Sequence, residues 1–251
     1  MEERFFFDGP GEVKLAAALH RPEEPAALGV VICHGMLSSK DSAKHVGIAA
    51  RLCEMGYAVL RFDFQGRGES AGDLLGLTFT RQVNECRSAI RELRQRTDVE
   101  RVALVGSSMG AAVAILVAGT AGEGIAGLVS LAALARTDRL AERIAGPKGL
   151  AAWRRKGWLR LESEPVGYSL VEDGERVEVL AAAGRVVCPW LILHGEEDEI
   201  VPAEDARALW AASEGRAELE IVLGADHRFS APDALAHITD QAVGFLRAAL
   251  G

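Results

Sequence analysis

The sequence predicts an α/β fold with a mostly parallel, eight-stranded sheet that helices cover on both faces. Short apolar runs alternate with longer segments of helical periodicity along most of the chain. The central apolar runs are nearly continuous, as in strands that are buried on both faces. The 251 residues are 49% hydrophobic and 25% charged, which is enough to bury one large core. We therefore expect a single domain over residues 1–251.

Eight segments are expected to form the strands. Each is apolar or rich in β-branched and aromatic residues, and turn-forming or polar residues bound it. No helical pattern separates the first two, so we expect an antiparallel start at one edge of the sheet. The segments are RFFF (4–7), VKLAAALH (13–20), GVVIC (29–33), YAVLRF (57–62), RVALVG (101–106), AGLVSL (126–131), PWLILH (189–194) and AELEIVL (217–223).

Five segments between and after these strands are expected to form helices. Their apolar residues recur at helical spacing, and the first segment stops at a glycine, a common residue just past a helix end. Strands that alternate with helices in this way are typical of a parallel sheet. The segments span 44–55, 79–96, 109–119, 203–213 and 233–250.

The alternation breaks between residues 132 and 183, after the sixth strand. This segment contains Trp153, Trp158 and Tyr168, which are two of the four tryptophans and one of the two tyrosines. A long irregular segment in a compact domain is usually functional or has structure of its own. We expect a cap over the sheet, with a small hairpin formed by WLRLES and VGYSL.

Composition argues against several classes of protein. The formal net charge is -8 and no block is rich in lysine or arginine, so neither nucleic acid nor an anionic membrane is the expected partner. The acidic start MEERFFFDGP lacks the profile of a secretory signal, and no apolar run approaches the roughly 20 residues of a membrane helix. Four widely spaced cysteines favour free thiols in a reducing cytoplasm: Cys33, Cys53, Cys86 and Cys188.

No metal or cofactor is expected. The sequence has no Cys-x-x-Cys pair and no His-Glu-x-x-His motif. Residues 66–71 (GRGESA) match the dinucleotide-binding pattern G-x-G-x-x-A, but no helix opens directly after them and Glu69 would meet the pyrophosphate. We interpret DFQGRGES as a structural loop.

The segment GSSMG, residues 106–110, fits the pattern G-x-S-x-G centred on Ser108. An apolar strand precedes it and a helix follows it, and this context exposes the serine on a sharp turn above a sheet. A side chain at Gly106 or Gly110 would collide with the neighbouring strand or helix. The glycines do not flank Ser107 symmetrically, so its side chain is expected to face away from the cleft.

A serine nucleophile needs a base, which follows it in the chain order of this fold. His237 lies within the last predicted helix, and His194 ends an apolar strand, so both are interpreted as structural. His227 lies in the loop LGADHRFS between the last strand and the last helix. From there its side chain can reach across the carboxyl ends of the strands, which makes His227 the preferred base.

The acid that orients the histidine is expected in HGEEDEIVP, just after a strand. Asp198 is favoured because the apolar residues and proline of EIVP fix the loop against the body. Asp226 is the competing candidate, but neighbouring residues on an extended loop point apart, so it would orient His227 poorly.

An oxyanion hole needs two backbone donors near the nucleophile. The N–H of Met109 lies at the start of the helix after Ser108. The loop after the third strand, within GVVICHGMLSSK, supplies a second donor, because Gly35 permits a tight turn that presents the N–H of Met36.

With these motifs in order, the sequence resembles the α/β-hydrolase superfamily over nearly its whole length. The shared motifs are HGM, RFDFQGRGES, GSSMG, HGEEDEIVP and GADHRFS. Within the superfamily it is similar to small serine esterases that include bacterial cinnamoyl and feruloyl esterases and related carboxylesterases. The resemblance implies Ser108 as nucleophile, Asp198 as acid, His227 as base, and Met36 and Met109 as oxyanion donors. The cap does not map to a known specificity.

The sequence thus favours a cofactor-independent carboxylesterase that acts on small or aromatic acyl esters. The expected partner is a small-molecule ester, and a homodimer is one expected assembly. Trp153, Trp158 and Tyr168 are candidates to line the substrate pocket, with attachment of the cap to the body as the alternative role.

Two other classes of function stay open. One is an acyl-CoA thioesterase or a serine peptidase of the same fold. Arg154, Arg155 and Lys156 could form the basic rim that coenzyme A phosphates need. The other is a non-catalytic protein that binds a small molecule, which the intact set of Ser108, His227 and Asp198 argues against.

Overall fold

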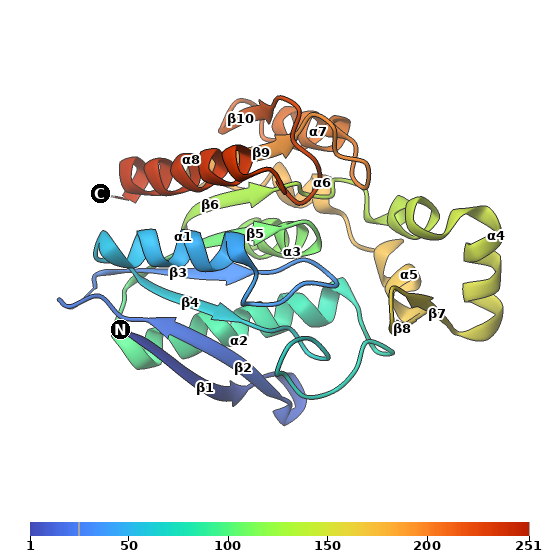
Figure 1. Cartoon of the computed structure of the whole chain (residues 1–251), viewed down its shortest axis with the longest axis horizontal. Helices are drawn as coiled ribbons and strands as arrows, with labels where there is room; N and C mark the ends of the chain where they lie inside the picture. Colours follow the sequence, from blue (N-terminus) through green and yellow to red (C-terminus); the bar gives the residue numbers. More distant parts are fainter. Residues whose placement is uncertain (25, 251) are drawn as a thin grey trace.

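The computed structural model describes residues 1–24 and 26–250 and contains the expected eight-stranded sheet. The strand order is β1-β2-β4-β3-β5-β6-β9-β10, and all the strands but those at the β1 edge run parallel (Figure 1). The strands are β1 (Glu2–Asp8), β2 (Lys14–His20), β3 (Leu28–Cys33), β4 (Ala58–Phe62), β5 (Arg101–Ser107), β6 (Ile125–Leu131), β9 (Trp190–Gly195) and β10 (Ala217–Val222).

The first two strands form the antiparallel edge that the sequence predicted. β1 pairs antiparallel with β2, and β2 pairs antiparallel with β4. Only a short 3-10 turn, η1 (Pro10–Glu12), joins β1 to β2. A tight connection of this kind is available to antiparallel strands, whereas parallel neighbours need a longer crossover.

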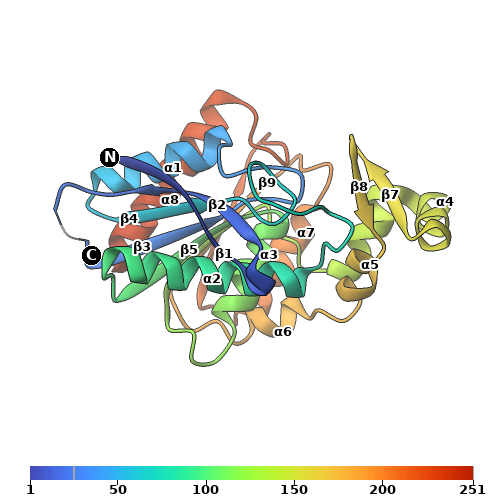
Figure 2. The same ribbon diagram turned by 90° about the horizontal axis from the view of Figure 1, so that it is seen from below.

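Helices cover both faces of the sheet, and successive residues of a strand point to opposite faces. In β3, Val30 and Ile32 pack with α1 (Ala43–Glu54) and α8 (Pro232–Leu250) on one face. Val31 and Cys33 belong to the larger core on the other face. That core is covered by α2 (Phe79–Thr97), α3 (Met109–Ala118), α6 (Val179–Ala183) and α7 (Ala203–Ala212) (Figures 1 and 2).

All five predicted helices are present, with ends within a few residues of the expected ones. In the part of the chain that is described, no helix combines the length and the apolar character that crossing a bilayer requires.

The cap projects beyond the carboxyl ends of the central strands (Figures 1 and 2). A hairpin is present, since β7 (Trp158–Leu161) and β8 (Glu164–Gly167) pair antiparallel. Its second strand begins before the predicted VGYSL, whose last two residues instead begin α5 (Ser169–Gly174). The last helix of the expected 132–183 segment, α6, instead packs against α3 and α7 beside the sheet, so the cap proper is shorter than expected. The cap elements are η2 (Thr137–Arg139), α4 (Leu140–Lys156), β7 (Trp158–Leu161), β8 (Glu164–Gly167) and α5 (Ser169–Gly174).

The loop DFQGRGES is structural, as the sequence predicted. Asp63 is fully buried and accepts hydrogen bonds from the backbone N–H of Lys40, from Lys40 Nζ and from the N–H of Glu69. No helix opens until Thr78 caps α2, whose Arg81 N–H bonds to the Thr78 hydroxyl. The network therefore ties the loop after β4 to the end of the loop after β3.

The same two loops are joined further along. Arg67 donates hydrogen bonds to the backbone carbonyls of Leu37 and Ser38. The N–H of Phe64 donates to Nε2 of the buried His34, 3.0 Å away. The loop after β4 thus fixes the backbone on both sides of Met36, the predicted oxyanion donor.

Glu85 in α2 gives a prediction for stability against pH. Its side chain is buried, and burial raises the pKa of Glu85 to about 7, although the Gln65 N–H and Arg81 act in the other direction. In the unfolded chain the carboxyl would ionise near 4.5. Between these two values the folded protein holds a proton that the unfolded chain has released, so folding stability falls as pH rises from 4.5 to about 7.

Glu85→Gln removes this titration. We expect the variant to gain roughly 2–3 kcal/mol over the wild type as the pH rises from 5 to 8. Urea unfolding of both proteins at the two pH values measures the change. If the difference in free energy of unfolding between the variant and the wild type were the same at both pH values, the raised pKa of Glu85 would be contradicted.

Candidate active site

Ser108 stands on the sharp turn between β5 and α3. Its φ of 55° and ψ of -120° are unusual for a residue that is not glycine. The turn is held in place because the Ser108 N–H donates to the carbonyl of Leu131 at the end of β6, 2.8 Å away. The constrained backbone directs the hydroxyl away from the sheet, as expected for a G-x-S-x-G turn.

The glycines at this turn are required by close approach of the backbone. A Cβ added to Gly110 would lie 2.4 Å from the carbonyl oxygens of Cys33 and His34. A Cβ on Gly106 would lie 2.5 Å from Cα of Ala111. These distances confirm the predicted collisions with the neighbouring strand and the following helix.

The structure brings Ser108, His227 and Asp198 into one chain of hydrogen bonds. The Ser108 Oγ lies 3.0 Å from Nε2 of His227, and Nδ1 of His227 lies 2.7 Å from Oδ2 of Asp198. The three residues come from loops that follow β5, β10 and β9, and these loops meet at the carboxyl ends of parallel strands. The geometry suits proton transfer from a serine hydroxyl to an imidazole.

Asp198 is held as a carboxylate in a fixed orientation. Its Oδ1 accepts hydrogen bonds from the N–H groups of Ile200 and Val201 at 2.9 and 2.7 Å. Burial would raise the pKa of Asp198, but hydrogen bonds from His194 and His227 outweigh it and lower that pKa well below its ordinary value. Asp198 therefore stays ionised, and its Oδ2, 2.7 Å from Nδ1 of His227, orients that ring.

His194 lies behind Asp198 and does not contact Ser108. Its Nε2 lies 2.8 Å from the carbonyl oxygen of Val201 and 3.1 Å from Oδ2 of Asp198. His237 in α8 pairs with Glu220 in β10. Both histidines thus occupy positions that fit the structural roles expected for them.

The two rival residues lie outside the hydrogen-bonded chain. Oδ1 of Asp226 accepts from the N–H of Ser230, 2.7 Å away, and no bond to the His227 ring is present among the described residues. The hydroxyl of Ser107 is mostly buried and accepts a hydrogen bond from Lys44 Nζ at 2.9 Å.

Lys44 is the charged neighbour of the site that sequence reasoning missed. Its Nζ lies 5.4 Å from the centre of the Phe229 ring, two residues after His227. Burial lowers the pKa of Lys44 to about 8, against the charges of Asp226 and Asp198. Lys44 stands 63 positions before Ser107, and no local motif marks the contact.

The two predicted oxyanion donors lie on either side of the serine. Met109 is the first residue of α3, where backbone N–H groups have no partner within the helix. A Cβ on Gly35 would lie 3.3 Å from Cβ of Ser108, so the loop that carries Met36 passes directly beside the serine. Within the described residues, neither the Met36 nor the Met109 N–H donates to another protein group. Both are thus available to a bound oxygen atom.

The three aromatic residues of the cap occupy different environments. Trp153 is fully buried inside the cap, and its indole N–H donates to the carbonyl of Val166 in β8. This position fits the alternative role of holding the cap together. Trp158 is 39% exposed on β7, whereas Tyr168 is partly buried against the main core.

A comparison with protein families agrees with this geometry. The model of the family described as serine aminopeptidase, S33, matches residues 24–178, which is more than half of the chain. The chain belongs to this S33 family. The matched residues run from before β3 into the cap and include Ser108, while Asp198 and His227 follow them.

Curated relatives of this S33 family member include thioesterases. The mouse (Mus musculus) palmitoyl-protein thioesterase ABHD10, mitochondrial, is 26% identical over 186 residues, which are 69% of this chain and 60% of the mouse protein. An uncharacterized protein YfhR of Escherichia coli O157:H7 is 24% identical over 235 residues, 91% of this chain and 73% of that protein. The chain thus spans about three fifths of the mouse relative.

Solved structures confirm the α/β-hydrolase fold. Est1E from Butyrivibrio proteoclasticus, solved with ferulic acid bound, superposes with a TM-score of 0.87 at 22% identity and covers 98% of this chain and 99% of its own. Mouse alpha/beta hydrolase domain-containing protein 10 gives a TM-score of 0.76 at 23% identity, with 98% and 99% covered. The expected membership of an enzyme superfamily with esterase-like neighbours is confirmed.

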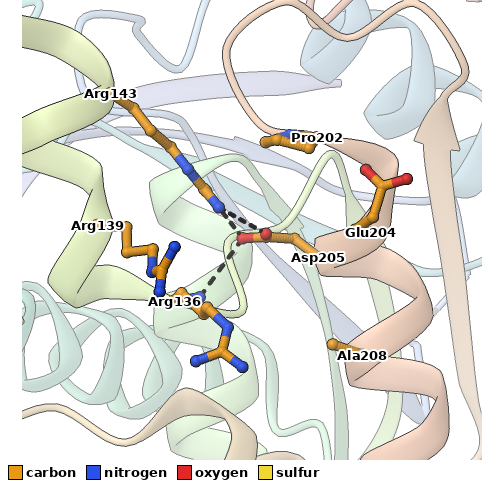
Figure 3. Close-up of a pocket in the computed structure, with 7 residues that line it drawn as sticks. All are labelled: Arg136, Arg139, Arg143, Pro202, Glu204, Asp205 and Ala208. Atoms are coloured by element: carbon orange, nitrogen blue, oxygen red, sulfur yellow. Dashed lines mark hydrogen bonds and ion pairs between the residues drawn. The ribbon is translucent and has the colours of Figure 1, made fainter.

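In this S33 family member, an ion pair between α4 and α7 is one of the contacts that attach the cap to the body. Asp205 in the first turn of α7 is buried and bonds to both terminal nitrogens of Arg143 in α4, at 2.8 and 3.0 Å (Figure 3). The same carboxylate accepts from the N–H groups of Ala135 and Arg136. One side chain of the body thus holds both the start of the cap segment and its first long helix.

Asp205→Ala is therefore expected to loosen the cap. It should lower the free energy of unfolding by about 2 kcal/mol, because charged hydrogen bonds to buried groups are lost, and it should speed proteolysis within the cap. Asp138→Ala, at an exposed carboxylate of the same segment, is the control. Equal cleavage patterns for Asp205→Ala and the control would contradict the assignment.

Proposed function

We propose that this protein is a serine hydrolase that cleaves carboxylic esters through an acyl-enzyme. The observation that carries the proposal is the hydrogen-bonded chain from Ser108 through His227 to Asp198. The unpartnered N–H groups of Met36 and Met109 beside the serine support it. A binding protein would not need a base aligned on a serine hydroxyl.

In the proposed reaction, Ser108 Oγ attacks the carbonyl carbon of the ester while its proton moves to Nε2 of His227. The carbonyl oxygen becomes an oxyanion that the N–H groups of Met36 and Met109 stabilise. Collapse of this intermediate breaks the bond to the alcohol, which takes the proton from His227. The acyl group stays on Ser108.

Water then completes the proposed cycle. His227 accepts a proton from the water as its oxygen attacks the acyl carbon, and the proton returns to Ser108 when the acid leaves. Asp198 holds the imidazole in the tautomer with hydrogen on Nδ1 and stabilises the positive charge that forms on the ring.

The proposed substrates are esters of small or aromatic acids. The support is the fold shared with Est1E, whose structure holds ferulic acid. Trp158 and Tyr168 of the cap supply aromatic surface for such a group.

A thioesterase is the second candidate, because curated relatives are palmitoyl-protein thioesterases. The exposed Arg154, Arg155 and Lys156 in the last turn of α4 could meet the phosphates of coenzyme A. Peptide hydrolysis is a third reaction to test, because the matching family is described as serine aminopeptidase, S33. Rates on p-nitrophenyl acetate, butyryl-CoA and an aminoacyl anilide would rank the three reactions.

Labelling by a fluorophosphonate probe tests the proposal itself. The wild-type protein should become covalently labelled, and Ser108→Ala should not. A wild-type protein that stays unlabelled and hydrolyses none of the three substrates would favour a non-catalytic binding protein.

We also propose a cytoplasmic location. Its support is the set of four cysteines, which are all free thiols. Even Cys33 and Cys86, whose sulfur atoms are 3.6 Å apart, share a hydrogen bond and no disulfide. Fractionation of the cells that produce the protein checks this, and recovery with a secreted or membrane fraction would contradict it.

A further inference from the structure

A cavity of about 390 Å³ lies where the cap meets α7 (Figure 3). Three arginines of the cap line one side of it, and residues of the body line the other. They are Arg136, Arg139 and Arg143 on the cap, and Pro202, Glu204, Asp205 and Ala208 on the body.

The charges around this cavity are not balanced. Arg143 is paired with Asp205, whose oxygens also accept from two backbone N–H groups. Within residues 1–24 and 26–250, the guanidinium groups of Arg136 and Arg139 form no ion pair or hydrogen bond, and Figure 3 shows the Glu204 carboxylate turned away from them. In a chain of net charge -8, two unpaired arginines thus gather at one hollow.

Two short stretches of chain link the lining of this cavity to residues of the candidate active site. Pro202 directly follows Val201, whose N–H donates to Asp198. The segment that leads to Arg136 leaves β6 at Leu131, and the carbonyl of Leu131 accepts from the Ser108 N–H. The basic cavity and Ser108 therefore lie at the same end of the sheet.

We infer that this hollow, here called the arginine pocket, binds an anionic group, a carboxylate or a phosphate, carried by the substrate. The inference rests on the proposed ester hydrolysis and deepens it by naming a substrate class. Guanidinium groups suit such anions, because their planar N–H donors match two oxygens of a carboxylate or phosphate at once. Arg143, fixed by Asp205, forms the rigid wall, and Arg136 and Arg139 supply the free donors.

Matched pairs of substrates test the arginine pocket. One pair is p-nitrophenyl butyrate and the p-nitrophenyl monoester of glutaric acid, which differ by a carboxylate on the acyl group. The other pair is butyryl-CoA and butyryl-pantetheine, which differ by the diphosphate and the 3′-phosphoadenosine of the leaving group. The first pair reports on a carboxylate and the second on a phosphate.

The double variant Arg136→Gln/Arg139→Gln removes the free donors. The control Arg91→Gln/Arg247→Gln removes the same charge from exposed positions of α2 and α8. We expect the first variant to lower kcat/KM about tenfold for the anionic member of at least one pair, mainly through KM. Its rate on the neutral member, and both rates of the control, should stay within about twofold.

The outcomes separate the pocket from the proposed function. Equal changes on the anionic and neutral members, or equal losses in the control variant, would overturn the arginine pocket while leaving hydrolysis intact. A wild-type protein that hydrolyses none of the four substrates would instead contradict the proposed function. Added salt should weaken the preference for the anionic substrate, because partly exposed charges are screened.

Discussion

Ser108→Ala is expected to lower kcat for ester hydrolysis by a factor on the order of 10⁵ or more. The Ser108 hydroxyl, 3.0 Å from Nε2 of His227, is placed to attack the substrate and to pass its proton to the base. The fold should persist, since the backbone of residue 108 makes the turn and its side chain is not needed for packing. Turnover of p-nitrophenyl acetate, with circular dichroism as a check on folding, measures the effect.

The neighbouring serine gives the matched control. Ser107→Ala should keep most of the activity, because its hydroxyl bonds to Lys44 and not to His227. If Ser107→Ala abolished hydrolysis and Ser108→Ala did not, the assignment of the nucleophile would be reversed.

Asp198→Asn is expected to reduce kcat by a factor on the order of 10⁴. The amide can present N–H towards Nδ1 of His227, which would stabilise the wrong tautomer and leave Nε2 protonated in the resting enzyme. Because the pKa of Asp198 is held well below its ordinary value, the wild-type carboxylate should go on orienting His227 in mildly acidic solution. Steady-state rates from pH 5 to 9 for both proteins measure this.

Asp226→Asn is the control for the acid. Asp226 bonds to Ser230, so this variant should change kcat by only a small factor. A large loss in Asp226→Asn with little loss in Asp198→Asn would transfer the orienting role to Asp226.

The sequence predicted the sheet and the hydrogen-bonded chain because both are marked by local patterns. Apolar runs such as Val102–Val105 define a buried strand wherever they occur, and the glycines around Ser108 are imposed by backbone contacts shorter than a Cβ allows. His227 is recognisable because, of the histidines that follow Ser108 in the chain, it is the one expected in a loop at the carboxyl ends of the strands.

The cap was predicted less completely, for reasons that are also physical. Gly146, with φ of 63° and ψ of 173°, breaks α4 in two, and Pro147 follows it, so neither half shows a long apolar stripe. The contact of Arg143 with Asp205 joins residues 62 positions apart. Such contacts depend on how helices and strands pack after they have formed. No pattern in the residues next to them in the sequence predicts them.

The cap leaves the sheet after β6 and rejoins the helical layer at α6, and among the cap elements none contributes a strand to the main sheet. In the proposed reaction, the residues that break the ester bond lie in loops at the ends of the strands. The residues that select the substrate lie in one continuous inserted segment. Grafting that stretch from a relative should therefore transfer selectivity without rebuilding the reaction centre, so the two properties can evolve at different speeds.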